Sequence, residues 1–178
     1  MGGYCFINNA AVAAQSFLDN GAKRVSILDI DYHHGNGTQE IFYARSDVQV
    51  INLHADPSQE YPYFLGHRDE AGAGEGEGFN VNYPMPFGTE WPAWFDALKD
   101  ACGKLAAYQP DAVVVSLGVD TFEKDPISRF KLRCEHYPLI GAYLATLGLP
   151  TLFVMEGGYA VAEIGVNAVG VLTGFDGN

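Results

Sequence analysis

The stretch LDIDYHHGNGT, residues 28–38, places two acids and a histidine directly after an apolar run. Alternate residues of an extended chain share a face, so Asp29, Asp31 and His33 are expected to point the same way. Two neighbouring carboxylates repel each other unless a cation lies near them. Carboxylate oxygens together with an imidazole nitrogen are typical ligands of zinc or a similar divalent metal. The spacing therefore predicts a metal site.

Polar side chains also lie at the ends of three other apolar runs. In an open parallel sheet, ligands bind outside the carboxyl ends of the strands, so these side chains are expected to meet Asp31 and His33. Asp120 is a candidate third ligand, and three protein ligands leave one position open, as in catalytic zinc sites. The polar residues are His54 and Asp56 after 48–54, Asp120 at the end of 110–120, and Glu156 and Tyr159 near the end of 150–158.

The elements that must position these residues alternate along the chain. Runs rich in β-branched and other apolar residues predict strands that are buried on both faces, and the segments between them have apolar residues at helical spacing. This alternation predicts one α/β domain with a mainly parallel sheet. The glycines and acids of 66–80 predict a surface loop. The expected strands are 23–31, 48–54, 110–120 and 150–158, and the expected helices are 8–20, 90–108, 134–147 and 161–173.

Composition excludes some classes of function. The chain has 178 residues, with 22 acidic against 10 basic side chains. This balance argues against a nucleic-acid partner and suits a cationic or neutral substrate. No apolar stretch is long enough to span a membrane, and no signal peptide is evident. Three cysteines at irregular spacing indicate reduced thiols, which predicts a cytoplasmic protein.

Four motifs resemble the zinc-dependent histone deacetylase superfamily, and most closely its bacterial acetylpolyamine amidohydrolases. They are GGYCFINNAAVAA, LDIDYHHGNGTQEIFY, SLGVDTFEKDP and MEGGY, which occur in order across essentially the whole chain. The resemblance implies an arginase-like α/β fold with a mainly parallel sheet and flanking helices. It also implies hydrolysis of acetyl groups from acetylated polyamines or similar small acetylated amines.

The same resemblance assigns roles to individual residues. It makes Asp31, His33 and Asp120 the ligands of one catalytic zinc ion, and Tyr159 the catalytic tyrosine that stabilises the oxyanion. Tyr4 and Phe64 match an aromatic pair that walls the substrate tunnel. A structural potassium ion would be bound by Asp29, by main-chain oxygens of Asp31, His33 and Leu53, and by Asn52, where the family often has serine.

One departure from the family pattern concerns the general base. Family members have two adjacent histidines shortly before GGYCF, one of which deprotonates the attacking water, whereas this chain begins with Met1-Gly2-Gly3. We therefore expect residues 1–178 to be a single, partial catalytic domain that lacks its N-terminal part. The chain alone is then expected to associate with itself and to turn over slowly or not at all.

Alternative functions remain open at this point. They are acetyl-lysine protein deacetylation and a catalytically inactive metal-binding fragment. A dinuclear manganese site of the arginase type is weaker, because DIDYHHGNG does not supply the DxHxD run that such a site needs.

Overall fold

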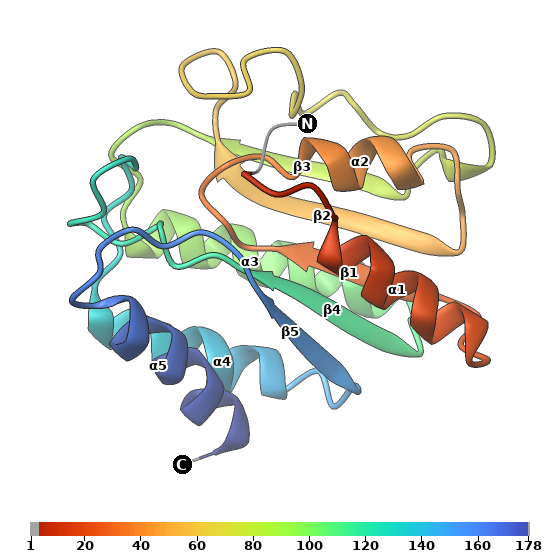
Figure 1. Cartoon of the computed structure of the whole chain (residues 1–178). Helices are drawn as coiled ribbons and strands as arrows, with labels where there is room; N and C mark the ends of the chain where they lie inside the picture. The colour runs from red at the N-terminus through yellow and green to blue at the C-terminus, as the bar shows by residue number, and fades with distance from the viewer. Residues whose placement is uncertain (1–3, 178) are drawn as a thin grey trace.

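The computed structural model describes residues 4–177, and the described chain forms one sheet flanked by helices (Figure 1). Short 3₁₀ turns lie at Gly74–Gly76 and Cys134–His136. In chain order, the helices and strands are α1 (Asn9–Asp19), β1 (Val25–Asp29), α2 (Asn36–Phe42), β2 (Val48–Ala55), β3 (Asn80–Met85), α3 (Trp91–Tyr108), β4 (Ala112–Leu117), α4 (Tyr137–Ala145), β5 (Thr151–Met155) and α5 (Ile164–Asp176).

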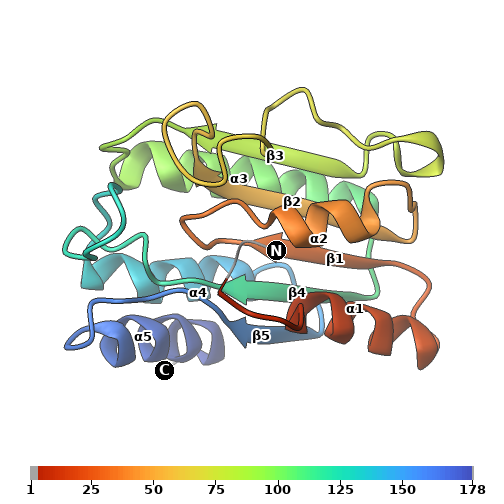
Figure 2. The same ribbon diagram turned by 45° about the horizontal axis from the view of Figure 1, so that its top comes forward.

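The sheet has the strand order β3-β2-β1-β4-β5, and every neighbouring pair is parallel. All five strands therefore end at the same edge of the sheet (Figure 2). Three strands, β2, β1 and β4, lie inside the sheet and are buried along their whole length. The predicted α/β fold with a parallel sheet is confirmed.

Two hydrophobic cores lie on opposite faces of the sheet. The larger core packs α3 and α4, together with Val171 of α5, against one face. The smaller core packs the alanines of α1 against Val25, Ile27 and Val114 on the other face. Helices on both faces explain why the sequences of β1 and β4 are largely apolar rather than alternating.

Local sequence signals account for several helix boundaries. The side chain of Asn8 caps α1 by accepting a hydrogen bond of 2.8 Å from the Ala11 N–H. At the other end of α1, Gly21 adopts a φ of +103°, which a side chain would oppose. Pro92 lies in the first turn of α3, where its missing N–H costs nothing.

The structure contains two elements, α2 and β3, that the sequence did not predict. Helix α2 begins at Asn36 within the HHGNG stretch, which favours a turn. Strand β3 begins at Asn80, the last residue of the expected loop 66–80, and it contains Pro84. The four expected strands and four expected helices are present within a few residues of their expected bounds. None of the helices in residues 4–177 combines the length and the apolarity that crossing a membrane requires.

Candidate functional site

A cavity of about 740 Å³ opens at the carboxyl edge of the sheet. Residues from the ends of β1, β4 and β5 line it, and so does the segment before α1. This is where ligands are expected to bind in an open parallel sheet. Its lining includes Asp29, Asp31, His33, Glu156 and Tyr159.

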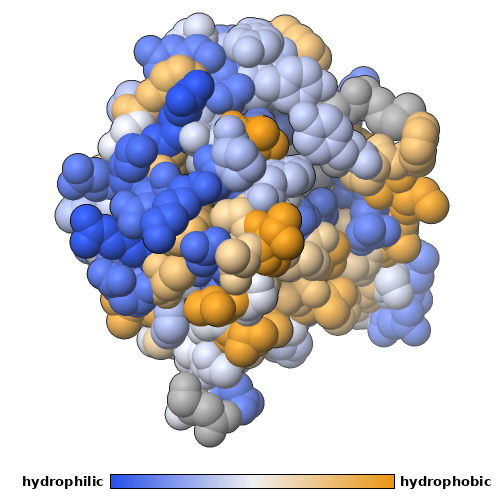
Figure 3. Space-filling model, turned by 60° about the vertical axis from the view of Figure 1, so that its left-hand side comes forward, coloured by the Kyte–Doolittle hydropathy of each residue, from blue (hydrophilic) through white to orange (hydrophobic). Residues whose placement is uncertain are grey.

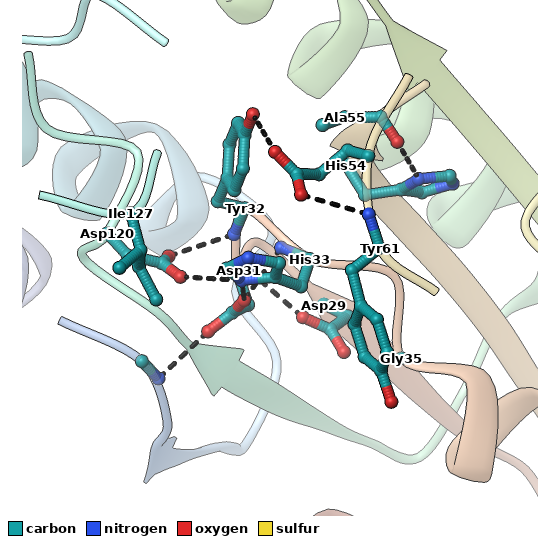
Figure 4. A network of polar contacts seen from close by, with 12 residues as sticks. Asp29, Asp31, Tyr32, His33, Gly35, His54, Ala55, Tyr61, Asp120 and Ile127 are labelled. Carbon is teal, nitrogen blue, oxygen red and sulfur yellow. Dashed lines mark hydrogen bonds and ion pairs between the residues drawn. The ribbon is translucent and has the colours of Figure 1, made fainter. Parts of the chain in front are cut away.

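Asp31 and His33 line the cavity, and the buried Asp120 lies close to both of them (Figure 4). One ligand-type atom from each residue lies within 4.8 Å of the others. His33 Nδ1 lies 3.5 Å from Asp31 Oδ1 and 3.1 Å from Asp120 Oδ2. Zinc ligands lie about 2.0–2.1 Å from a tetrahedral metal, which puts neighbouring donor atoms about 3.3–3.4 Å apart. The donor types and their spacing therefore fit a zinc ion.

Backbone hydrogen bonds hold the two candidate carboxylate ligands in place. The Tyr32 N–H donates to Asp120 Oδ1 at 2.9 Å, and the Gly157 N–H donates to Asp31 Oδ2 at 2.8 Å. Asp29 Oδ1 accepts the Asp31 N–H at 3.0 Å, which fixes the turn that leaves β1. The strand ends thus orient the carboxylates independently of a bound ion.

Gly157 must be a glycine for this arrangement to exist. A Cβ on Gly157 would lie 2.5 Å from Asp31 Oδ2 and 2.7 Å from Asp120 Oδ2, closer than real contacts allow. The loop after β5 can approach the carboxylates only because this side chain is missing.

The site carries an excess of negative charge. Burial, assisted by the charge of Asp31, raises the pKa of Asp29 and of Asp120 above their usual range. Burial lowers the pKa of His33, but hydrogen bonds to Asp120 and Asp31 outweigh it and raise that pKa to about 10. Clustered carboxylates with raised pKa values are stabilised by a cation among them.

Tyr159 lines the same cavity from the loop after β5. Its backbone N–H donates to Asp125 Oδ2 at 2.7 Å, and the other oxygen of the buried Asp125 accepts the Ile127 N–H at 3.0 Å. Burial, followed by the charges of Asp31 and Asp120, raises the pKa of the Tyr159 phenol. The phenol therefore stays protonated and able to donate a hydrogen bond.

The two expected tunnel residues differ in their positions. Tyr4 lines the cavity, and its ring meets that of Tyr159 edge-on at 6.3 Å between centroids. Phe64 does not belong to the cavity lining and is 65% exposed. The structure places Tyr61 on the cavity wall instead. The role of Phe64 as the second tunnel ring stays a prediction.

Sequence reasoning also missed Glu60 and Ile127, which line the cavity. Glu60 Oε1 accepts the Tyr61 N–H at 2.9 Å, and Oε2 accepts the hydroxyl of Tyr32 at 3.0 Å. Glu60 thereby ties the cavity wall to the segment that carries His33. An isolated acid or isoleucine in a loop gives no sequence signal that could have found these residues.

The residues expected around potassium lie beside the zinc candidates. Asp29 and Asn52 are direct partners in the β1–β2 register, with Leu53 next along β2. The Gly35 N–H donates to Asn52 Oδ1 at 3.3 Å, and a Cβ on Gly35 would meet both Asn52 and the Asp29 carboxylate. The geometry brings these side-chain oxygens together, and the potassium site stays a prediction.

The remaining histidines do not join the cluster. His34 turns away and donates from Nε2 to Gln39 at 2.9 Å, and its ring packs against that of His54. His54 lies inside β2 rather than after it, and its Nδ1–H donates to the Ala55 carbonyl at 2.8 Å. Asp56 accepts the Ser58 N–H at 2.8 Å and is not among the residues that line the cavity. His54 and Asp56 are thus not brought to Asp31, contrary to their expected position.

Comparisons with known proteins agree with this geometry. The histone deacetylase domain matches residues 1–174. Acetylpolyamine amidohydrolase 1 of Pseudomonas aeruginosa is 62% identical over 99% of this chain and 51% of its own length. Acetylpolyamine amidohydrolase of Mycoplana ramosa is 57% identical over 99% of this chain and 52% of its own length.

A solved structure also matches this chain. The crystal structure of acetylpolyamine aminohydrolase from Burkholderia pseudomallei has a TM-score of 0.95 and 46% identity, covering 98% of this chain and 51% of that one. This chain spans about half the length of the curated relatives it matches. Its fold, the order of its motifs and the match over residues 1–174 lead to one conclusion: the chain belongs to the histone deacetylase domain family.

Proposed function

We propose that this chain carries the metal-binding and oxyanion-stabilising part of an amidohydrolase that removes acetyl groups from acetylated polyamines. The observation that carries the proposal is the spacing of 3.1 and 3.5 Å between His33 Nδ1 and the Asp120 and Asp31 carboxylates. Relatives named acetylpolyamine amidohydrolase, at up to 62% identity, support the choice of reaction. Residues 1–178 then form a single, partial catalytic domain.

In this proposal, Asp31, His33 and Asp120 hold one zinc ion. When bound, zinc acts as a Lewis acid that polarises the amide carbonyl and lowers the pKa of water. Three protein ligands leave room for that chemistry, whereas structural sites use four. Asp29 and Asn52, beside this triad, are the proposed side-chain ligands of a structural potassium ion, which Leu53 joins through its main-chain oxygen.

Tyr159 has the role of oxyanion donor. Its protonated phenol donates a hydrogen bond to the carbonyl oxygen as negative charge develops on it. Losing one such donor typically costs about 10²–10³-fold in turnover. Gly157 permits the close approach of this loop, and Asp125 fixes the backbone of Tyr159 through the 2.7 Å hydrogen bond.

The cavity lining supports a cationic alkyl amide as substrate. Of the described residues, those that line the cavity include the acids Asp29, Asp31, Glu60 and Glu156 but no lysine or arginine. The rings of Tyr4 and Tyr61 can pack against an alkyl chain and attract its ammonium group. Acetylated polyamines and acetyl-lysine share this chemistry, and the names of the most similar relatives favour the polyamine.

Acid–base catalysis is proposed to require a group outside the described residues. His33 is engaged with Asp31 and Asp120, and His34 is bonded to Gln39, so neither is placed to take a proton from the attacking water. A positioned acid–base group typically contributes about 10²–10⁴-fold. We therefore expect the 178-residue chain alone to be slow or inactive.

An acetate-release assay tests the proposal. The chain, and a version extended by the part of the Pseudomonas aeruginosa relative that it does not match, are given zinc with acetylputrescine or an acetyl-lysine peptide. We expect turnover only from the extended protein, with acetylputrescine preferred. Strong preference for the peptide would reject the polyamine assignment. Equal rates for both proteins would reject the claim that the acid–base group lies outside this chain.

A matched pair of variants separates the roles of the metal and the tyrosine in the extended protein. Tyr159→Phe should keep zinc and lose about 10²–10³-fold in turnover, because only the hydroxyl is removed. Asp120→Asn should lose zinc as well as activity. Full activity of Tyr159→Phe would contradict its role as oxyanion donor.

A further inference from the structure

A set of buried amide side chains lies between α2, β2 and β3. Hydrophilic residues cover large parts of the face shown in Figure 3, where water satisfies their polar atoms, but these amides are shielded from water. A buried amide costs free energy unless its hydrogen bonds are made inside the protein. The set comprises Gln39, Asn52, Asn80 and Asn82, each 5% exposed or less.

The orientation of the Asn82 amide is fixed by the backbone. Its Nδ2 group lies 3.1 Å from the carbonyl oxygen of His67, which can only accept a hydrogen bond. The nitrogen of this amide therefore faces the loop before β3. Its oxygen then faces the neighbouring strand β2, where Asn52 is the register partner of Asn82.

Gln39 of α2 supports the same orientation. Its Nε2 group donates to Glu70 Oε2 at 2.6 Å, and an ionised carboxylate can only accept. Gln39 Oε1 therefore faces β3, where it accepts the Nδ2 groups of Asn80 and Asn82, each at 2.9 Å. The nitrogen of Asn82 thus has two acceptors, and both lie away from Asn52.

Asn52 takes its orientation from Asn82. Asn82 Oδ1 accepts a hydrogen bond from Asn52 Nδ2 at 3.3 Å, which turns the amide nitrogen of Asn52 toward β3. The amide oxygen of Asn52 is then turned toward β1 and the chain that follows it, where it accepts the Gly35 N–H at 3.3 Å. Because the bond to Gly35 is long, the contact with Asn82 is a needed second anchor.

The oriented oxygen of Asn52 lies beside the Asp29 carboxylate. These two residues are direct partners in the β1–β2 register. A Cβ on Gly35 would contact both Asp29 Oδ2 and Asn52 Oδ1, so the two oxygens face the same small region. Carbonyl dipoles ligate potassium through oxygen, whereas an amide turned the other way would present N–H donors that repel a cation.

We propose that Asn82 is a positioning residue for a monovalent cation, because it holds the amide oxygen of Asn52 toward Asp29 before the ion binds. The inference rests on the potassium site proposed above and adds a residue that contacts the ligand Asn52 rather than the ion. An amide that is already oriented spares the ion the cost of turning it. The affinity for potassium should therefore depend on Asn82.

Potassium-dependent unfolding of the full 178-residue chain tests the inference. Urea unfolding is followed while KCl replaces choline chloride at constant ionic strength, with a chelator present. An ion that binds only the folded state raises the free energy of unfolding with its concentration, and this dependence gives its dissociation constant. We expect potassium to stabilise the wild type, and Asn82→Leu to raise the dissociation constant about 10–100-fold, as loss of a ligand's outer partner typically does.

Asn80→Leu is the matched control. Asn80 lies on the same strand and is similarly buried, and it also donates to Gln39 Oε1 and to a loop carbonyl, that of Glu70. Its partner on β2 is Val50 rather than Asn52. Both variants should lower stability in choline chloride, but only Asn82→Leu should weaken potassium binding. Equal weakening by both variants would overturn the proposal.

A double-mutant cycle shows whether Asn82 acts through Asn52. Asn52→Ser offers a hydroxyl oxygen that turns toward an ion without a partner to orient it. In this background, Asn82→Leu should leave the dissociation constant for potassium unchanged, and a loss as large as in the wild type would overturn the proposal. Asn82→Ser replaces Asn82→Leu if the leucine variant does not fold, since its short hydroxyl cannot bridge Asn52 and the His67 carbonyl.

The outcomes separate this inference from the potassium site on which it rests. A wild type whose stability does not respond to KCl overturns the potassium site and the role of Asn82 together. Stabilisation of the wild type by potassium that persists unchanged in Asn82→Leu overturns the role of Asn82 alone. Neither result depends on acetate release, so both stand apart from the proposed activity.

Discussion

Replacing Glu156 by glutamine should stabilise the metal-free protein at high pH but not at low pH. Burial and the charge of Asp31 raise the pKa of Glu156 from 4.5 to about 7. Between these two pH values the folded state keeps a proton that the unfolded state has lost. The contribution of Glu156 to the free energy of unfolding therefore falls as pH rises from 4.5 to about 7, and it does not recover at higher pH. Glutamine removes the ionisation and its penalty.

The size of the effect follows from the pKa difference. Raising a pKa from 4.5 to about 7 corresponds to about 3 kcal/mol at most. Glu156 is only half-buried, so solvent screening reduces the expected gain to about 1–2 kcal/mol at pH 8. At pH 4.5, where half of the unfolded carboxyls are protonated, the gain should fall to about 0.4 kcal/mol or less. Zinc at the triad should also shrink the gain, because it offsets the Asp31 charge.

Urea unfolding at pH 4.5, 6 and 8 in the presence of a chelator measures this difference. Glu40→Gln is the control, since Glu40 is exposed on α2 and should respond little at any pH. A gain for Glu156→Gln that is equal at all three pH values would refute the electrostatic reasoning. A loss of stability at pH 8 would show that the carboxylate has a favourable partner.

Three further predictions concern the loop after β5 and the association of the chain. Gly157→Ala forces a Cβ against the Asp31 and Asp120 carboxylates, so zinc affinity should fall about 10–100-fold in a chelator competition, and unchanged affinity would contradict the geometry. Asp125→Ala leaves the N–H groups of Tyr159 and Ile127 without their acceptor and should cost about 2–4 kcal/mol in urea unfolding. Asp125→Asn keeps one acceptor oxygen and should cost less. Equal losses in the two variants would argue against the role of the Asp125 carboxylate as the acceptor of both N–H groups. In sedimentation the isolated chain should self-associate through its exposed edge, whereas a monodisperse monomer would count against this.

The sequence was most informative where burial dictates residue type. Strands buried on both faces must be apolar, so β1 and β4 were evident from their sequences, and the parallel order followed from the helices between them. The convergence of Asp31, His33 and Asp120 was predictable for the same reason, because polar residues at strand ends have few structural explanations. Their geometry matches the expectation, and the bound ion stays a proposal.

The sequence was least informative where tertiary contacts determine the local structure. Helix α2 starts at Asn36-Gly37, which by themselves favour a turn, and β3 contains Pro84, which disfavours a central strand but is tolerated at an edge. Tyr61 lines the cavity, and its N–H donates to Glu60 Oε1, whereas Phe64 lies outside the cavity lining. No local pattern encodes such a choice.

Zinc binding to the 178-residue chain tests the central claim most directly. Metal analysis and X-ray absorption of the wild type and of Asp120→Ala should be compared after equilibration with zinc and removal of the free ion. We predict one zinc per wild-type chain, ligated by one nitrogen and otherwise by oxygen, and loss of that ion in Asp120→Ala. One zinc per chain in the variant, or sulfur ligation in the wild type, would contradict the assignment of Asp31, His33 and Asp120.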